Sequence, residues 1–381
     1  MKQLLCAAVL SLLVPVYALA QPQSGNPMQS GNAAMKYWQA IALLPHFDEK
    51  QEKLLENWNT IPLNAEAKQL LQTSQAIMKY LGRAATCSHC YWDLDYQEGP
   101  GLLLPHLAKC RTLGRLAALQ IRYEFDNGNV SAGVDSFLNL MSLARNAGSD
   151  PILISILVGY AIESFALEAI APYLPGLDKE LLSKLAAGTA KLPKIALVQQ
   201  AIGTEKTYMN GWLLKQMEAA EMQKPGEWRT ILQSLFSPDA REKEGNQKVL
   251  DSIDTFAKAK QYSNDLMAVY DELFKAFNLP YAEQADRLWE LTQQARKNNP
   301  LAVLLLPALN KTHAAQNRYQ AKLALFLAAL AVAEKGPDEL KAITDPFGNG
   351  PFEYKQLPQG FELTSKLKST DGKQVSYSVG K

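Results

Sequence analysis

Histidine and cysteine are scarce in this chain of 381 residues, with four of each, and neither sign of charge is in excess. The chain carries 39 Lys and Arg against 38 Asp and Glu, which excludes a strongly cationic nucleic-acid binder. With 47% hydrophobic and 20% charged residues it is not a disordered protein. The patterns G-x-S-x-G, G-x4-G-K-[ST], H-E-x-x-H and G-x-G-x-x-G are all missing from the sequence. No enzyme class is therefore indicated by a motif.

Residues 1–20 have the layout of a secretory signal peptide. Lys2 supplies the positive end, an apolar stretch follows, and Ala18-Leu19-Ala20 places small residues before a cleavage point. We expect an exported protein of the periplasm or cell envelope, with retention of this segment as an anchor as the alternative. Loss of Lys2 leaves equal numbers of positive and negative side chains, so no long-range steering toward nucleic acid is expected.

The rest of the chain predicts a mainly α fold, an irregular array of packed helical hairpins with a small C-terminal antiparallel three-stranded sheet. A flexible polar tether is expected at 21–33, a helical domain at 34–315, and a helix-plus-sheet module at 316–381. Apolar periodicity predicts helices at 103–125, 130–145, 151–173, 247–277, 281–297 and 301–335, the last broken near Pro307. The most apolar runs, 152–162 and 323–333, are shorter than the roughly 18 residues of a membrane span. We expect them to be buried core helices.

The C-terminal segment changes from helical to alternating periodicity. Apolar residues alternate with polar ones around Phe352, around Phe361 and from Val375 to Val379, and turns are expected at Pro358-Gln359-Gly360 and Asp371-Gly372. The three strands have one apolar face, which we expect to cover the preceding helix.

This tail resembles the C-terminal part of type II secretion pseudopilins over about 60 residues. The motifs that carry the resemblance are Lys335-Gly336-Pro337, Asp345-Pro346-Phe347-Gly348, Gly360-Phe361 and Tyr377-Ser378-Val379-Gly380. It implies a helix packed on a small sheet that a D-P-F-G-type loop enters. The amino-terminal apolar helix of that family, with its leader-peptidase site, is replaced here by a conventional signal peptide, so fibre polymerisation is not implied.

A second resemblance covers most of the chain. The run Cys90–Tyr96, with Gly99-Pro100, Leu104–Leu107 and Arg111, is similar to a group of uncharacterised secreted helical proteins of planctomycete-type bacteria that carry the same pseudopilin-like tail. The resemblance implies a fold and a compartment, and it assigns no activity.

Three cysteines remain after the signal peptide, and three interpretations are open: a metal site, one disulfide with one free thiol, or free thiols only. Cys87-x2-Cys90-x15-His106-x3-Cys110 has the spacing of a Cys3His zinc site. In an oxidising compartment a disulfide is the favoured interpretation, either Cys87–Cys90 or Cys90–Cys110. No cofactor is therefore expected, with zinc as the alternative.

An acidic and aromatic loop is the main candidate binding site. Paired carboxylates beside aromatic rings can perform acid–base chemistry or bind a sugar by stacking. The structural alternative is that the aromatics anchor the loop and that Asp95 pairs with Arg111 or Arg115. The candidate binding residues are Trp92, Asp93, Asp95, Tyr96 and Arg111.

Asp95, His106 and Glu163 are the candidate catalytic residues. Glu163 lies within a very apolar helix, where burial would raise its pKa, unless an arginine pairs with it. We expect an exported, non-catalytic scaffold or binding protein of the cell envelope. It would use an envelope protein partner, with docking of the C-terminal sheet to a secretion- or pilus-like assembly. The alternative is an envelope hydrolase with a site between the Trp92–Glu98 loop, His106 and Glu163.

Overall fold

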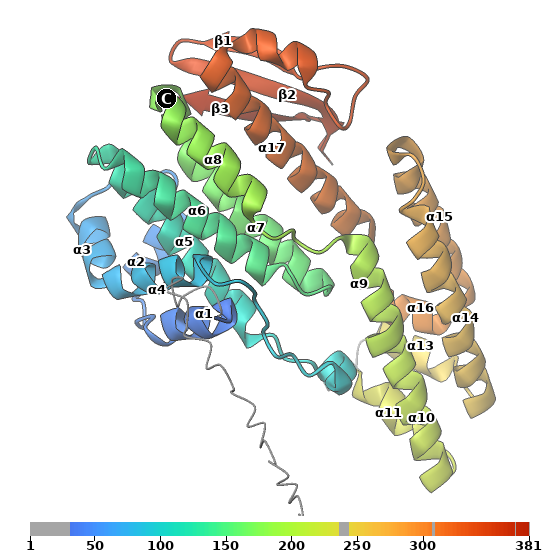
Figure 1. Cartoon of the computed structure of the whole chain (residues 1–381). Coiled ribbons are helices and arrows are strands. Elements are labelled where there is room, and N and C mark those ends of the chain that lie inside the picture. Colours follow the sequence, from blue (N-terminus) through green and yellow to red (C-terminus); the bar gives the residue numbers. More distant parts are fainter. Residues whose placement is uncertain (1–30, 236–243, 307–308, 370, 381) are drawn as a thin grey trace, which may run out of the picture.

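The computed structural model describes residues 31–235, 244–306, 309–369 and 371–380. It confirms the expected fold class, a mainly helical protein with a three-stranded antiparallel sheet at the C-terminus (Figure 1). The predicted signal peptide and most of the predicted tether lie outside the described residues. The last two residues of the predicted tether belong to the folded body instead. Asn32 caps the first helix and its backbone pairs with that of His89, and Ala33 is the first residue of that helix.

The N-terminal body is a set of helices in which α5, α6 and α7 pack side by side. The α5–α6 hairpin closes through a short turn in which Gly128 has a φ of 78°, a conformation that favours glycine. The helices of this body are α1 (Ala33–Ala42), α2 (Glu49–Glu56), α3 (Ala65–Thr73), α4 (Gln75–Ala85), α5 (Pro105–Asp126), α6 (Val130–Ala147), α7 (Leu153–Ile170) and α8 (Lys179–Lys191), with the 3-10 turns η1 (Tyr96–Gly101) and η2 (Ala171–Gly176).

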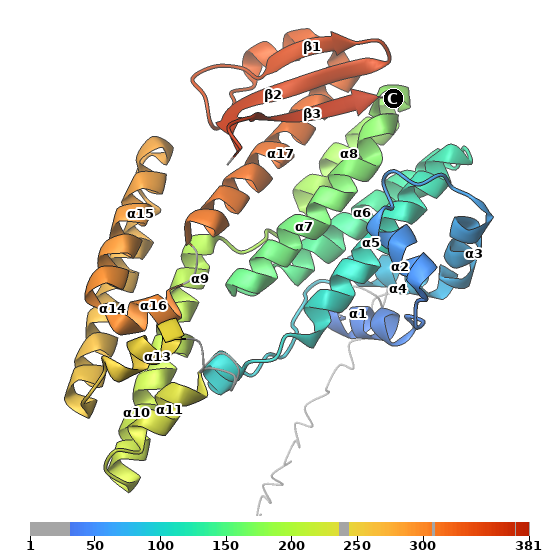
Figure 2. The same cartoon turned by 180° about the vertical axis from the view of Figure 1, so that it is seen from behind.

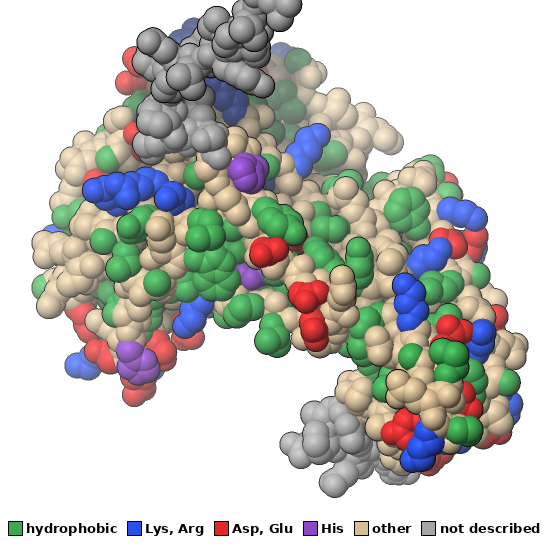
Figure 3. Space-filling model, turned by 60° about the horizontal axis from the view of Figure 1, so that its bottom comes forward, with side chains coloured by type: hydrophobic (Ala, Val, Ile, Leu, Met, Phe, Trp, Pro, Cys, Tyr) green, Lys and Arg blue, Asp and Glu red, His purple; other side chains and the backbone are tan. Residues whose placement is uncertain are grey.

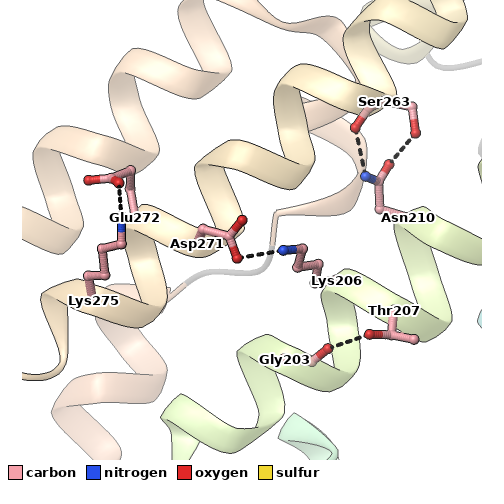
Figure 4. Close-up of polar contacts among 8 residues, drawn as sticks. All are labelled: Gly203, Lys206, Thr207, Asn210, Ser263, Asp271, Glu272 and Lys275. Atoms are coloured by element: carbon pink, nitrogen blue, oxygen red, sulfur yellow. Dashed lines mark hydrogen bonds and ion pairs between the residues drawn. The ribbon is translucent and has the colours of Figure 1, made fainter.

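A second body follows in the chain and has its own apolar core, beside the first in Figure 1. It consists of α9 (Val198–Thr204), the π-helical turn η3 (Glu205–Asn210), α10 (Gly211–Gln223), α11 (Trp228–Ser234), α13 (Glu244–Asp251), α14 (Phe256–Ala276), α15 (Tyr281–Asn298) and α16 (Pro300–Leu305). Polar pairs join η3 to α14 (Figure 4). Asn210 and Ser263 exchange two buried hydrogen bonds of 2.8 and 2.9 Å, and Lys206 pairs with Asp271.

The C-terminal part is the long helix α17 (Leu309–Lys335), the turn η4 (Pro337–Ala342) and strands β1 (Glu353–Leu357), β2 (Gly360–Lys368) and β3 (Gln374–Gly380) in the order β1-β2-β3. The inner side chains of β2 and β3 are buried and their outer neighbours are more exposed, so the expected apolar face is present. It lies over α17 (Figure 2). The buried Asp345 carboxylate fastens the D-P-F-G loop by accepting hydrogen bonds from Phe347 N, Ser365 Oγ and Lys366 N.

The hydrophobic cores do not follow the boundary expected at residue 315. Side chains of α17 and of the sheet belong to the same apolar cluster as α1 to α8, whereas residues 202–309 form a separate cluster. Tyr377 of β3 links the sheet to the N-terminal body, since its hydroxyl donates a 2.7 Å hydrogen bond to Leu167 O of α7. The chain therefore leaves the first core after α8 and returns to it with α17.

Two of the predicted helices have the wrong boundaries. The expected helix 247–277 is two helices, because the chain turns at 252–255 and the Thr255 side chain caps α14. The apolar helix expected from residue 151 begins only at Leu153, and it is not capped by the preceding side chain of Asp150. The Asp150 carboxylate accepts a hydrogen bond from the Tyr96 hydroxyl instead. The break expected near Pro307 is present, since α16 ends at Leu305 and α17 begins at Leu309.

Within the described residues, only the segment Leu153–Gly176 is long and apolar enough to span a membrane by length and composition. In the fold 61% of its most apolar window is buried, and Glu163 is ion-paired within it. This burial is consistent with the expected core helix.

Candidate functional site

The loop that carries the candidate binding residues is attached to the start of α1. Asn32 Nδ2 donates to Tyr91 O at 2.8 Å, and Asn32 Oδ1 accepts from Tyr91 N at 2.9 Å. Ala33 N donates to His89 O at 2.8 Å. One asparagine thus caps a helix and holds a loop nearly sixty residues away in the sequence.

The same loop reaches the second helical body. Gly99 has a φ of 52°, and a Cβ at this position would lie 2.5 Å from the Trp212 ring of α10. Glycine is needed here both for the left-handed backbone and for the close approach of the indole. Tyr96 packs on Tyr208 with ring centroids 4.9 Å apart. The loop is therefore held between the two bodies.

Three rings form a stack at the base of the loop. Trp92 lies between Tyr37 and His106, with centroid distances of 5.8 and 4.2 Å and interplanar angles of 19° and 21°. The indole Nε1 donates to Asn146 O at 2.9 Å, so both faces and the polar edge of Trp92 are occupied. Trp38 stands nearly perpendicular to Trp92, at 6.1 Å. Trp92 therefore anchors the loop, whereas Trp38 is the half-buried ring beside it.

A cavity of about 340 Å³ opens between this aromatic cluster and the loop. Three exposed carboxylates surround it, and no cation pairs with them among the described residues. On the face shown in Figure 3, hydrophobic and acidic side chains gather next to each other beside the notch between the two bodies. The lining residues are Trp38, Trp92, Asp93, Leu94, Asp95, Glu98, Gly101, Leu102, Leu103, Pro105 and His106.

Backbone strain also marks this loop. Asp93 has a φ of 57°, and it is the single non-glycine residue with a positive φ in the described part of the chain. Aspartate tolerates this region better than most residues, but the conformation still costs free energy. The fold therefore holds Asp93 at the cavity in a strained backbone conformation.

His106 contributes a neutral ring to the cavity. It is 1% exposed, and its Nε2 is buried with no hydrogen-bond partner in the described structure. Burial lowers the pKa of His106 to about 4, so the imidazole is uncharged at neutral pH. No described carboxylate hydrogen-bonds to the ring, so nothing in the described structure orients it for proton transfer.

The lowered pKa of His106 predicts a pH-dependent stability. The unfolded state protonates this side chain near its ordinary pKa, whereas the folded state resists protonation, so stability is lost as the pH falls from about 6.5 toward about 4. At about pH 5 the loss attributable to His106 is about 2 kcal/mol. Urea unfolding of the parent protein and of His106→Gln at neutral pH and at that pH measures it. An equal loss in both proteins would contradict this assignment.

Two of the five candidate binding residues, Tyr96 and Arg111, lie outside the cavity lining. The Tyr96 hydroxyl donates to Asp150 rather than facing the cavity. Asp95 does not pair with Arg111 or Arg115; its Oδ1 accepts from Gln97 N and caps η1. Arg111 is exposed and is not part of the cavity lining. Of the five binding candidates, the cavity brings together Trp92, Asp93 and Asp95.

Glu163 does not join the loop and His106. It is fully buried in α7, where its Oε2 lies 2.6 Å from Arg145 Nε and its Oε1 accepts from Arg145 at 2.9 Å. The Tyr319 hydroxyl donates to it at 3.3 Å. Burial raises the pKa of Glu163, while Arg145 opposes that shift. The arginine alternative is therefore the one found, and the three catalytic candidates do not form one site.

The thiols of Cys87, Cys90 and Cys110 are free in the structure. Cys90 is common to the two predicted disulfides. Burial raises the pKa of the Cys90 thiol to about 12. Either disulfide stays a prediction. Among the described residues no three His, Cys, Asp or Glu side chains are grouped to hold a metal ion, so the zinc alternative gains no support.

Sequence reasoning missed Trp38, Leu102 and Leu103 as part of this site. The first lies in α1, more than fifty residues before the loop, and its neighbour Tyr37 stacks on Trp92. The available signal was the adjacent pair Tyr37-Trp38 at the start of a helix. The sequence does not indicate which loop the rings of Tyr37 and Trp38 contact.

A scan of the chain against protein-family models found no matching family, and searches of curated proteins and of solved structures found no match. The pseudopilin-like tail and the likeness to secreted helical proteins therefore stay predictions. Function has to be argued from the geometry of this chain.

Proposed function

We propose that this protein is an exported, non-catalytic binding protein of the cell envelope, and that its loop cavity takes a basic side chain of an envelope protein partner. The observation that carries the proposal is the convergence of Asp93, Asp95 and Glu98 on one cavity beside Trp38, with no cation paired with them among the described residues. Export rests on the sequence of residues 1–20.

Charge and ring geometry favour a cationic guest. The three carboxylates attract a guanidinium or ammonium group, and the half-buried Trp38 ring offers a surface for a cation–π contact. His106 is neutral near pH 7 and adds no opposing charge. The apolar side chains Leu94, Leu102 and Leu103 suit the methylene stem of such a side chain.

The size of the cavity favours one side chain over a large ligand. Its volume of about 340 Å³ lies at the lower end of the range for small-molecule sites. Leu103 is 79% exposed at the rim, where a protein partner would cover it. A segment of a partner protein that inserts one arginine or lysine fits both features.

The hydrolase alternative receives less support from the same geometry. Asp95 and His106 do line one cavity, but no described carboxylate orients the imidazole, and Glu163 is engaged by Arg145. A general base with a pKa near 4 is a weak proton acceptor at neutral pH. Binding requires none of these missing parts.

Removal of the three charges tests the proposal. The variant Asp93→Asn, Asp95→Asn, Glu98→Gln, called here the cavity variant, keeps the shape of each side chain, and asparagine also tolerates the φ of position 93. Calorimetric titration with an amidated, N-acetylated Gly-Arg repeat peptide should show binding to the parent protein and at least about tenfold weaker binding to the variant. Higher salt should weaken the parent's binding.

A matched control removes the same number of charges elsewhere. Glu49→Gln, Glu52→Gln and Glu56→Gln alter α2, on the same helical body but outside the cavity. This control should bind the peptide as the parent does. Equal affinity of the parent and the cavity variant, or an equal loss in the control, would overturn the proposal.

The C-terminal sheet supplies a second feature for the scaffold role. β1 is an edge strand that pairs only with β2 in the described sheet, and free edges accept an added strand. Docking to a secretion- or pilus-like assembly at this edge remains part of the proposed function. It rests on the resemblance of the tail and on the position of β1 at the edge.

A further inference from the structure

Three cavities follow one another along α17, on the side of the molecule formed by α15, α17, α7 and the sheet. The first lies between α15, α17 and the β2–β3 turn, the second between α7 and α17, and the third between the end of α7, η2 and β3. Arg318 lines both the first and the second, and Lys322 lines both the second and the third. Each shared side chain borders two cavities, so the three cavities are neighbours around α17, and together they are called here the α17 groove.

The length of the α17 groove suits a chain-like ligand. From Asn310 to Lys322 the helix rises about 18 Å, and the third cavity extends the groove past that point to Ser376 and Ser378 of β3. The volumes are about 340, 260 and 270 Å³. A single small molecule would fill only one of them.

Aromatic rings are part of the lining of the first two cavities. Trp289 is 54% exposed and Tyr281 is 39% exposed in the first cavity, and both rings belong to α15. In the second cavity Tyr160 and Tyr319 stack at 4.1 Å. Tyr160 is buried, whereas the exposed rings of Trp289 and Tyr281 present flat faces that can pack against the C–H face of a sugar ring.

One buried polar atom in the first cavity lacks a partner. Asn310 Oδ1 is buried and accepts no hydrogen bond from the described residues, although the residue lines the cavity. Leaving such an acceptor without a partner is costly. A ligand hydroxyl would satisfy it.

The charge of the groove is positive at its first cavity. Arg318 and Lys368 line it and have no ion-pair partner in the described parts of the chain, and Asp286 is the one carboxylate in the lining. Further along, Lys322 is compensated, since it lies 3.0 Å from Glu168 and donates to Ser164. The two cations without a partner identify where a ligand carboxylate would bind.

We propose that the α17 groove binds an extended acidic polysaccharide, with a sugar ring on Trp289, a carboxylate between Arg318 and Lys368, and further sugar units in the cavities beside α7. This ligand differs in charge and class from the basic partner of the loop cavity, and the proposal does not rest on that function. A protein with both sites would connect an envelope polysaccharide to a protein partner.

The test uses the chain from residue 21 onward and galacturonate oligosaccharide as the probe. Calorimetric titration should show binding that weakens at high salt, because the carboxylates contact Arg318 and Lys368. Trp289→Ala and Arg318→Gln should each weaken binding by about tenfold or more. Both side chains are exposed, so the variants should keep the thermal transition of the parent.

Matched controls remove the same kinds of side chain outside the groove. Arg287→Gln removes a cation from α15 that pairs with Glu290, and Tyr91→Ala removes a ring that is 60% exposed. Neither should change the affinity. The cavity variant should also bind the oligosaccharide as the parent does, which separates this site from the loop cavity.

Three results would overturn the proposal. They are no binding of galacturonate oligosaccharide to the parent protein, equal binding of neutral maltose oligosaccharides, and equal binding of poly-L-glutamate. Equal binding of the neutral oligosaccharides would show that Arg318 and Lys368 do not contribute to recognition. The third would make the groove a site for acidic peptide instead of saccharide.

Discussion

Replacing Arg145 with methionine is expected to lower the free energy of unfolding by about 3–5 kcal/mol, because it leaves Glu163 as a buried charge without its cationic partner. Both side chains are almost completely inaccessible, and two contacts of 2.6 and 2.9 Å join them. Urea unfolding followed by circular dichroism measures the change.

The companion variants separate the lost pair from lost packing. Arg145→Met combined with Glu163→Leu removes both charges and should recover much of the stability, since a buried pair contributes little against apolar residues of similar volume. The exposed Arg287→Met serves as the control and should change stability by less than about 0.5 kcal/mol. A loss in Arg145→Met no larger than in the control would contradict the assignment.

The same variant should show a characteristic pH dependence. Burial already raises the pKa of Glu163, and removal of Arg145 takes away the main opposing influence. A carboxyl whose folded-state pKa is raised takes up its proton more readily in the folded state. The deficit of Arg145→Met should therefore shrink as the pH is lowered from neutral, because protonation of Glu163 removes the buried charge.

Replacing Tyr377 with alanine is the second variant with a large expected effect, about 3–5 kcal/mol of unfolding free energy. The ring is buried under the sheet, meets Phe326 of α17 edge to face at 6.3 Å, and its hydroxyl donates to Leu167 O. Tyr377→Phe should cost about 1 kcal/mol, since it loses only the hydrogen bond. Ser376→Ala, on the opposite face of β3, is the matched control and should be nearly neutral.

Tyr377 also tests how the sheet is built into the fold. If the strands share one core with α1 to α8, then far-ultraviolet circular dichroism and tryptophan fluorescence, to which Trp58 and Trp92 of the N-terminal body contribute, should report one coincident transition in Tyr377→Ala. A sheet that unfolded first while the tryptophan signal stayed native would support the independent module expected at 316–381 instead.

Part of the candidate site could be predicted from the sequence, because several of its residues lie close together along the chain. Trp92, Asp93, Asp95 and His106 were recognised because unusual residue types are concentrated in a short stretch, and they do line one cavity. Glu163 was recognised as a buried carboxyl, yet its role follows from Arg145, which is 18 residues away and on another helix. A pairing between helices is a property of their packing and leaves no trace in spacing along the chain.

The sequence by itself determined the elements of local structure. Apolar periodicity and turn residues were sufficient for α5, α6, α15 and the three strands, because helix and strand patterns depend on neighbours within a few residues. The same local information misplaced the start of α7, where Asp150 accepts from the distant Tyr96 hydroxyl instead of capping the helix.

Only the tertiary structure decided which elements share a core and which side chains meet. The return of α17 and the sheet to the first core, the stacking of Tyr37 on Trp92 and the groove between α7, α15 and α17 all join residues far apart in the sequence. Burial of apolar surface drives such contacts, and it depends on total area rather than on order along the chain. The composition therefore predicts that hydrophobic cores form. Which residues belong to each core is decided by how the helices and strands pack together.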